Sequence, residues 1–100
     1  MSIDRKRLMR ARADIFKALG HPARLAMVVA LGDGEKCVCE LQEIVGSDMS
    51  TVSKHLTVLR HAGLVDADKR GKQMFYALRL RCAVEFLSCV DRALVERSRS

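Results

Sequence analysis

Residues 42–64, QEIVGSDMSTVSKHLTVLRHAGL, decide the fold, because they read as two helices joined by a tight turn. Ser47 and Asp48 follow a glycine and supply the turn, and Ser50 is expected to cap the second helix with its hydroxyl. From that cap, small or apolar residues recur at the spacing of one helical face. They are Val52, Leu56, Leu59 and Gly63. This stripe predicts the buried face of the second helix.

The other face of this second helix carries polar and basic side chains. Such groups can donate hydrogen bonds to phosphates and to base edges in a major groove. Ordinary surface helices also have a polar, solvated face, so the pattern alone leaves both interpretations open. On the DNA-reading interpretation, the contacting residues are Ser50, Thr51, Ser53, Lys54, His55 and Thr57.

A predicted hairpin follows directly. Residues 64–68 and 73–80 read as two strands, since apolar residues alternate along the second. The turn between them is basic, and Lys69, Arg70 and Lys72 are its candidates for phosphate contacts. A helix-turn-helix followed by a basic hairpin is the order of a winged helix, in which the hairpin contacts the DNA backbone beside the groove.

The run CVCELQEIVGSDMSTVSKHLTVLRHAGLVDADKRGKQMFYAL, residues 37–78, resembles the ArsR/SmtB family of winged-helix metal-sensing repressors, in particular its arsenic-repressor branch. STVSKHLTVLRHAGLV matches the recognition helix of the family, KRGKQMFYAL its wing and CVCEL its metal-binding box. The similarity covers about residues 14–80. It implies a mainly α winged helix-turn-helix with the order helix, helix, helix, recognition helix, two strands and a last helix, used as a homodimer. It also implies a repressor that leaves its operator when a soft ion binds thiolates.

Composition agrees with a small DNA-binding protein. One hundred residues predict one domain, 1–100, and the 18 Lys and Arg against 12 Asp and Glu give a net charge of +6. This surplus suits double-stranded DNA. A membrane is not an expected partner, because the longest apolar run, residues 25–31, is far shorter than the roughly 20 residues that span a bilayer. The N-terminus lacks a secretory pattern, so a cytoplasmic location is expected.

The flanking segments predict dimerisation helices at both ends. Residues 3–19 form a helix pattern that ends at Gly20, and Pro22 opens a second helix that is apolar nearly all round. Residues 81–97 form the last helix, whose apolar residues are spaced by three and four. The same stripe could instead close the core of one protomer. The predicted interface residues are Leu8, Ile15, Ala83, Phe86, Leu87, Val90 and Leu94.

Cys37 and Cys39, just before a short predicted helix over residues 39–45, are the candidate ion ligands. Thiolates favour soft ions such as arsenite, antimonite, cadmium, lead, zinc or copper(I) over magnesium or calcium. Within a regular helix, residues two apart differ by about 200° around the axis, so the pair chelates only where the backbone is not helical. Binding is expected to distort the start of this helix, which packs against the recognition helix, and DNA must weaken ion binding by the same factor.

The third ligand that arsenite prefers departs from the family pattern. The position of the third cysteine in that pattern is Gln42 here. The ligand is missing, or supplied by a small cellular thiol, or supplied by Cys82 or Cys89 of the last helix. Their alternative role is plain packing. The resemblance favours arsenite or antimonite as inducer, since the cysteines of cadmium sensors and the histidines of zinc sensors in this family have no counterparts here.

Other functions remain open at this point. The same fold could sense oxidants or persulfide through Cys82 and Cys89, or through a thiol pair formed between the two subunits. A thiol metal carrier would not bind DNA, and a winged helix can also serve as a protein-interaction module. An enzyme is not expected, because the sequence has no nucleophile, base and orienting-acid set and no glycine-rich phosphate loop.

Overall fold

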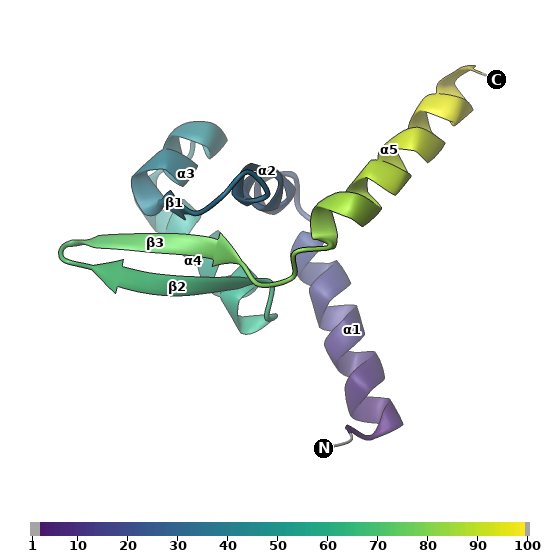
Figure 1. Cartoon of the computed structure of the whole chain (residues 1–100), viewed down its shortest axis with the longest axis horizontal. Coiled ribbons are helices and arrows are strands. Elements are labelled where there is room, and N and C mark those ends of the chain that lie inside the picture. Colours follow the sequence, from purple (N-terminus) through teal and green to yellow (C-terminus); the bar gives the residue numbers. More distant parts are fainter. Residues whose placement is uncertain (1–2, 100) are drawn as a thin grey trace.

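The computed structural model describes residues 3–99, which form five helices and a three-stranded sheet (Figure 1). The order confirms the predicted winged helix-turn-helix. A short first strand, which the sequence did not predict, is added to it. The elements are α1 (Arg5–Leu19), α2 (Pro22–Leu31), β1 (Lys36–Cys37), α3 (Val38–Val45), α4 (Met49–His61), β2 (Val65–Arg70), β3 (Gln73–Leu78) and α5 (Ala83–Arg99).

The turn between α3 and α4 is tight because Gly46 ends α3 in the left-handed conformation, with φ +77°. The predicted cap of α4 was wrong. Asp48 has an extended backbone, and its carboxylate accepts the backbone N–H of Thr51 at 2.7 Å, whereas Ser50 already lies in the first turn. That hydrogen bond lowers the pKa of Asp48. Asp48 therefore satisfies the helix start that Ser50 was expected to satisfy.

The sheet is antiparallel in the order β1-β3-β2. β1 pairs Lys36 with Tyr76 and Cys37 with Phe75. A strand of two residues leaves no alternation to detect, so pattern reasoning could not find it. β2 extends to Arg70 and β3 ends at Leu78, so two of the predicted turn residues, at 69 and 70, belong to a strand. These strands place the tip of the wing at Gly71 and the residue after it.

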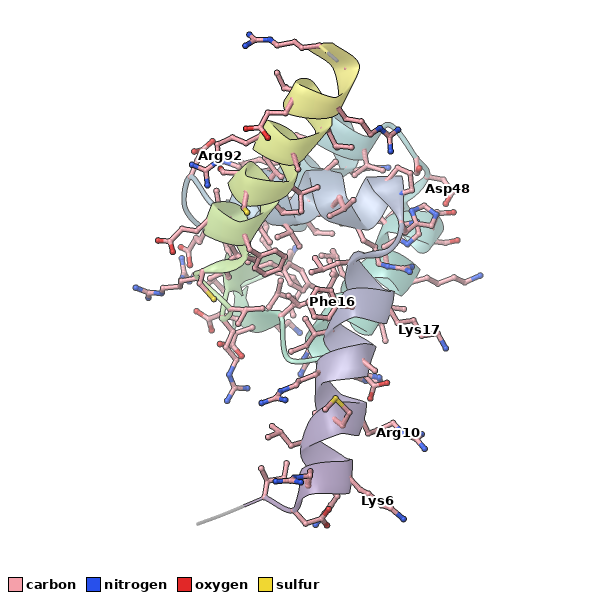
Figure 2. All side chains as sticks on the ribbon, turned by 90° about the vertical axis from the view of Figure 1, so that its right-hand side faces the viewer. Lys6, Arg10, Phe16, Lys17, Asp48 and Arg92 are labelled. Atoms are coloured by element: carbon pink, nitrogen blue, oxygen red, sulfur yellow. The ribbon has the colours of Figure 1, made fainter. Side chains whose placement is uncertain are left out.

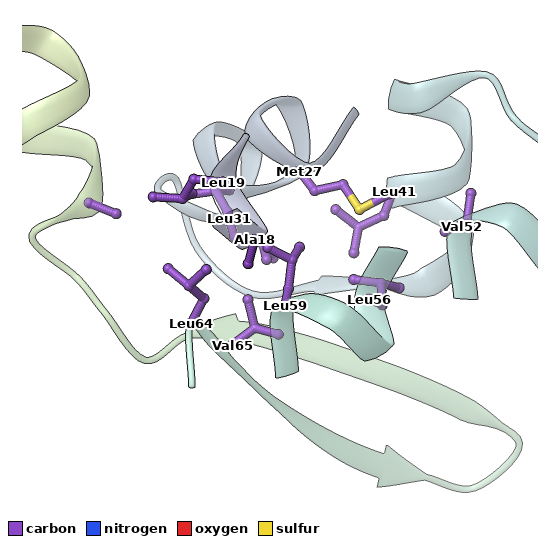
Figure 3. Close-up of a cluster of buried hydrophobic side chains, with 12 residues drawn as sticks. Ala18, Leu19, Met27, Leu31, Leu41, Val52, Leu56, Leu59, Leu64 and Val65 are labelled. Atoms are coloured by element: carbon purple, nitrogen blue, oxygen red, sulfur yellow. The ribbon is translucent and has the colours of Figure 1, made fainter. Parts of the chain in front are cut away.

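One hydrophobic core lies between α1, α2, α3, α4 and the inner face of the sheet (Figure 3). The predicted stripe of α4 is confirmed, because Val52, Leu56 and Leu59 are at most 1% exposed, although Gly63 is only half-buried. The side chains of Met27 and Leu41 fill the space between α2 and α3 above α4. α3 and α4 are thus held in one packed unit.

The apolar pattern of α2 also predicted that this helix is buried, and on one side this was wrong. Val29 is 51% exposed, so one face of α2 reaches the surface. The predicted start of α2 is confirmed, because Pro22 is its first residue; His21 is its N-cap and Gly32 its C-cap. Nowhere in residues 3–99 does a helix combine the length and apolar content that a membrane crossing requires.

α1 and α5 project away from this core in different directions (Figure 1). On the side that both helices share, Phe16 lies between them in Figure 2 and its ring centroid is 6.0 Å from that of Phe86. Part of the predicted interface is internal. Ala83 is fully buried within the protomer, and Ile15, Phe86 and Leu87 pack on its own core. The exposed apolar residues of the two helices are Met9, Phe16, Val90, Leu94 and Val95.

Candidate nucleic-acid interface and thiol site

The outer face of α4 presents four of the six residues predicted to contact DNA. Ser50, Ser53, Lys54 and Thr57 are exposed, and Thr51 is half-buried with its N–H used by the Asp48 cap. The Thr57 hydroxyl donates to the carbonyl of Ser53 at 2.9 Å, which leaves its oxygen free to accept. This face is therefore a row of short polar groups around one lysine. The opposite face of the same helix is buried in the core.

His55 is placed differently, because it faces α2. Nη1 of Arg24 lies 3.2 Å from Nδ1 of His55, and the rings of His55 and His21 are 4.5 Å apart. Arginine can only donate, so Nδ1 of His55 accepts and a neutral His55 carries its proton on Nε2. Arg24 also donates from Nε to the carbonyl of Ala18 at 2.6 Å. His55 thus joins α4 to the corner between α1 and α2.

This contact makes a pH-dependent stability predictable. Burial, with smaller contributions from His21 and Arg24, lowers the pKa of His55 below its ordinary value of 6.5. His55 therefore takes up a proton less readily in the folded chain than in the unfolded chain. The stability that neutral His55 contributes at pH 7.5 is lost as pH falls below about 6.5. We expect the free energy of unfolding in urea to fall between pH 7.5 and 5.5, and His55→Gln to flatten that dependence.

His61→Gln is the matched control for this measurement, since His61 is an exposed residue at the end of the same helix. It should keep the wild-type dependence. Carboxylates with lowered pKa, such as Asp48, titrate below this range and do not contribute to it. An unchanged slope in His55→Gln would refute the assignment of the pH dependence to His55.

The wing divides its basic residues into two kinds. Lys69 and Lys72 are exposed near the tip, and within residues 3–99 neither takes part in an ion pair. Arg70 instead bonds to Glu35 and Asp68, with its guanidinium 4.7 Å from the centroid of the Phe75 ring. The two lysines are therefore available for phosphates, whereas the predicted contact from Arg70 has to compete with two carboxylates.

The thiol pair lies where β1 becomes α3. Cys37 is the extended N-cap residue, with φ −77° and ψ 160°, and Cys39 is in the first helical turn. The 200° separation of helical residues therefore does not apply, because only one of the two is helical. Cys37 is 8% exposed and Cys39 is exposed. The Cys37 N–H donates to Oε1 of Glu40 at 3.1 Å, which lowers the pKa of that carboxyl.

The donor set for a soft ion is incomplete within one chain. Among residues 3–99, no three side chains of His, Cys, Asp or Glu are grouped so that they could hold a metal. Cys82 and Cys89 are exposed free thiols and do not complete a site with the Cys37 and Cys39 pair in this protomer. Gln42, at the position of the third family cysteine, donates instead to the carbonyl of Ser47 at 3.4 Å and supports the turn.

Three residues near these sites escaped prediction. Glu40 could have been found, because an acidic residue three positions after an N-cap is the spacing of a capping box. Arg24 contacts His55, which is 31 positions away in the sequence, and Glu35 contacts Arg70, which is 35 positions away. No local sequence pattern indicates such distant partners.

The helix α4 is buried on one face and polar and exposed on the other, and it is followed by a hairpin with exposed lysines. This arrangement defines a winged helix-turn-helix protein. Comparison with known proteins gives the family. The sequence pattern of the arsR family of bacterial regulatory proteins matches residues 21–67. An uncharacterised HTH-type transcriptional regulator of Methanocaldococcus jannaschii is 38% identical over 80 residues, which cover 79% of this chain and 90% of that protein. The chain belongs to the ArsR/SmtB family.

Two further likenesses agree. The biofilm growth-associated repressor of Xylella fastidiosa is 42% identical over 66 residues, or 66% of this chain; the chain spans only 58% of that repressor. The homodimeric winged helix-turn-helix DNA-binding domain of a possible ArsR-family regulator from Mycobacterium bovis superposes with a TM-score of 0.80. That structure is 28% identical, and the match covers 96% of this chain and 90% of that one. These relatives are regulators, not enzymes.

Proposed function

We propose that this protein is a homodimeric repressor that binds operator duplex DNA. The observation that carries the proposal is the exposed face of α4, with Lys54 among short polar side chains, beside a wing that presents Lys69 and Lys72. Side chains of this kind reach base edges and phosphates when a helix enters the major groove. The net charge of +6 per chain is doubled in a dimer and favours a polyanion.

The second copy is proposed to pack on α1 and α5. Single exposed apolar residues are ordinary on protein surfaces, but a contiguous apolar surface marks an interaction site. Phe16 is 64% exposed and Leu94 53% exposed, on two helices that share one side of the protomer (Figure 2). We place residues 1–100 in one DNA-binding domain whose first and last helices dimerise.

The inducer is proposed to be a soft ion, arsenite or antimonite, held by the thiolates of Cys37 and Cys39. Because Cys37 is buried as the N-cap of α3 while Cys39 is exposed, we expect the sulfur of Cys37 to move outward when both thiols hold one ion. That movement disturbs the first turn of α3, which packs on α4 through Leu41 and Val52. The ion therefore weakens DNA binding, and a third ligand comes from outside the protomer.

The test is binding of the reduced protein to the DNA upstream of its own gene, by fluorescence anisotropy, with and without arsenite and separately with peroxide. Release by arsenite alone supports the thiol pair as an ion switch. Release by peroxide alone supports a second candidate, a redox-sensing repressor, which the exposed thiols of Cys82 and Cys89 favour. No specific binding at low salt would refute the repressor and leave a thiol metal carrier.

Lys54→Gln tests the recognition helix. Loss of one phosphate contact per protomer should weaken DNA binding and reduce the slope of log K against log salt by about 0.9 per contact, hence roughly 1.8 for a dimer. Lys6→Gln makes the same change on α1, well away from α4 (Figure 2), and should leave the slope unchanged. Equal slopes in the two variants would remove Lys54 from the DNA contact.

A further inference from the structure

Arg70 has the most contacts of any charged side chain in the wing. Its Nη1 and Nη2 donate to the two carboxylate oxygens of Glu35 at 2.5 Å and 2.8 Å, and its Nε donates to Asp68 at 2.9 Å. The guanidinium also stacks on Phe75. These partners come from β2, from β3 and from the loop that precedes β1. One side chain therefore ties together three segments of the chain.

These contacts change what Arg70 can do. Two carboxylates compensate its charge and raise the pKa of its guanidinium, and they occupy all three of its nitrogens. Each of these bonds uses one N–H group, so two of the five N–H donors of Arg70 remain, and a phosphate would have to compete with two carboxylates that already hold the guanidinium. The side chains of Arg70 and Glu35 are 49% and 38% exposed, and an ion pair so exposed contributes little to global stability. We therefore expect this ion pair to affect the orientation of the wing more than the stability of the whole protein.

The partner of Arg70 outside the hairpin, Glu35, belongs to the segment that carries the thiols. Glu35 directly precedes β1, whose second residue is Cys37. Cys37 pairs across the sheet with Phe75, the residue on which Arg70 stacks. A two-residue strand has little pairing of its own, so the Glu35–Arg70 ion pair adds a contact that holds the start of β1 beside the hairpin. Any movement of Cys37 out of the core has to disturb this arrangement.

We propose that Glu35 and Arg70, with Asp68 and Phe75, form a latch that holds the wing against the thiol segment, and that Arg70 is a positioning residue, not a phosphate ligand. The second part of the inference rests on the proposed function: when the thiols of Cys37 and Cys39 take an ion, β1 moves, the latch opens and the wing loses its fixed orientation. The thiol pair then acts on DNA binding through the wing as well as through α4.

The latch itself is tested on the free protein by amide hydrogen exchange at residues 36–37 and 75–76. Glu35→Gln and Arg70→Gln should each speed exchange there, and the double variant should be no faster than Arg70→Gln, because Arg70 is the partner of Glu35 in the latch. Arg79→Gln, which removes a longer 3.9 Å ion pair with Asp66 in the same hairpin, is the control and should have no effect there. Unchanged exchange in both single variants overturns the latch.

DNA binding separates the latch from a phosphate contact. A latch predicts that Glu35→Gln and Arg70→Gln both weaken binding, by between about two- and thirty-fold, with the salt slope unchanged. A phosphate contact predicts the opposite for Glu35→Gln, which would free the arginine and tighten binding. Asp33→Asn is the matched control, since it removes the same charge two residues away from an exposed position. Tighter binding by Glu35→Gln than by Asp33→Asn would overturn the positioning role.

Coupling to the thiols is tested with arsenite as the probe. Exchange at residues 36–37 and 68–75 should rise when arsenite is added to the wild-type protein and stay constant in Cys37→Ser/Cys39→Ser. Release of DNA by arsenite without a change at these amides would overturn the coupling and leave the repressor intact. If arsenite has no effect on DNA or exchange, the inducer proposal and the coupling fail together, while exchange in the Glu35 and Arg70 variants still decides the latch.

Discussion

Cys37→Ser/Cys39→Ser should bind operator DNA as the wild-type protein does and no longer be released by arsenite. Serine oxygens are hard donors and do not replace thiolates for a soft ion. The fold should survive at both positions. Cys37 is the N-cap of α3, where serine is among the preferred residues, and Cys39 is exposed. The loss of response is therefore not expected to result from unfolding.

The measurement is anisotropy of labelled operator DNA titrated with the variant, with and without arsenite, alongside an unfolding curve. Cys82→Ser/Cys89→Ser is the matched control: it removes two exposed thiols at the other end of the chain and should still be released. If the Cys37 and Cys39 variant still leaves DNA on arsenite addition, the thiol site assignment is wrong. If only the control loses its response, the sensor includes Cys82 or Cys89.

Leu94→Glu should convert the dimer into folded monomers and weaken operator binding by roughly 100-fold or more, because the two recognition helices no longer bind as one unit. Leu94 is 53% exposed on α5, so the protomer core does not depend on it. In a dimer through α1 and α5, the new carboxylate would be buried without a partner, which is strongly unfavourable.

Sedimentation velocity gives the oligomeric state of this variant, and anisotropy gives its affinity for DNA. Val29→Glu is the control, since Val29 is 51% exposed but lies on α2, which is not one of the two helices of the proposed interface. It should remain dimeric with near wild-type affinity. A Leu94→Glu protein that stays dimeric would place the interface elsewhere on the surface.

The helix-turn-helix could be predicted because its information is local. Val52, Leu56 and Leu59 follow the period of a helix, and the turn residues stand between two apolar patterns. The cap was assigned to the wrong residue because residues 47, 48 and 50 all have capping chemistry, and only the backbone conformation of Asp48 decides between them.

The parts that escaped prediction depend on distant contacts. Ala83 matched the seam of the last helix but is buried in the protomer, since a single stripe cannot indicate which partner covers it. His55 stood in the recognition helix and was expected on its DNA face, yet it packs on residues at the start of α2. The sequence suggests that the charge of Arg70 is unpaired, because its partner Glu35 lies 35 residues earlier.

The position of Cys37 as the cap of α3 links the sensitivity of the proposed switch to local folding. Its N–H is held by Glu40, so the thiol can be captured only at the expense of that helix start. Substitutions that strengthen the first turn of α3 would raise the inducer concentration at half-response, and substitutions that weaken it would lower that concentration. The dose at which such a regulator responds can thus change through one helix terminus, with the ligands themselves unaltered.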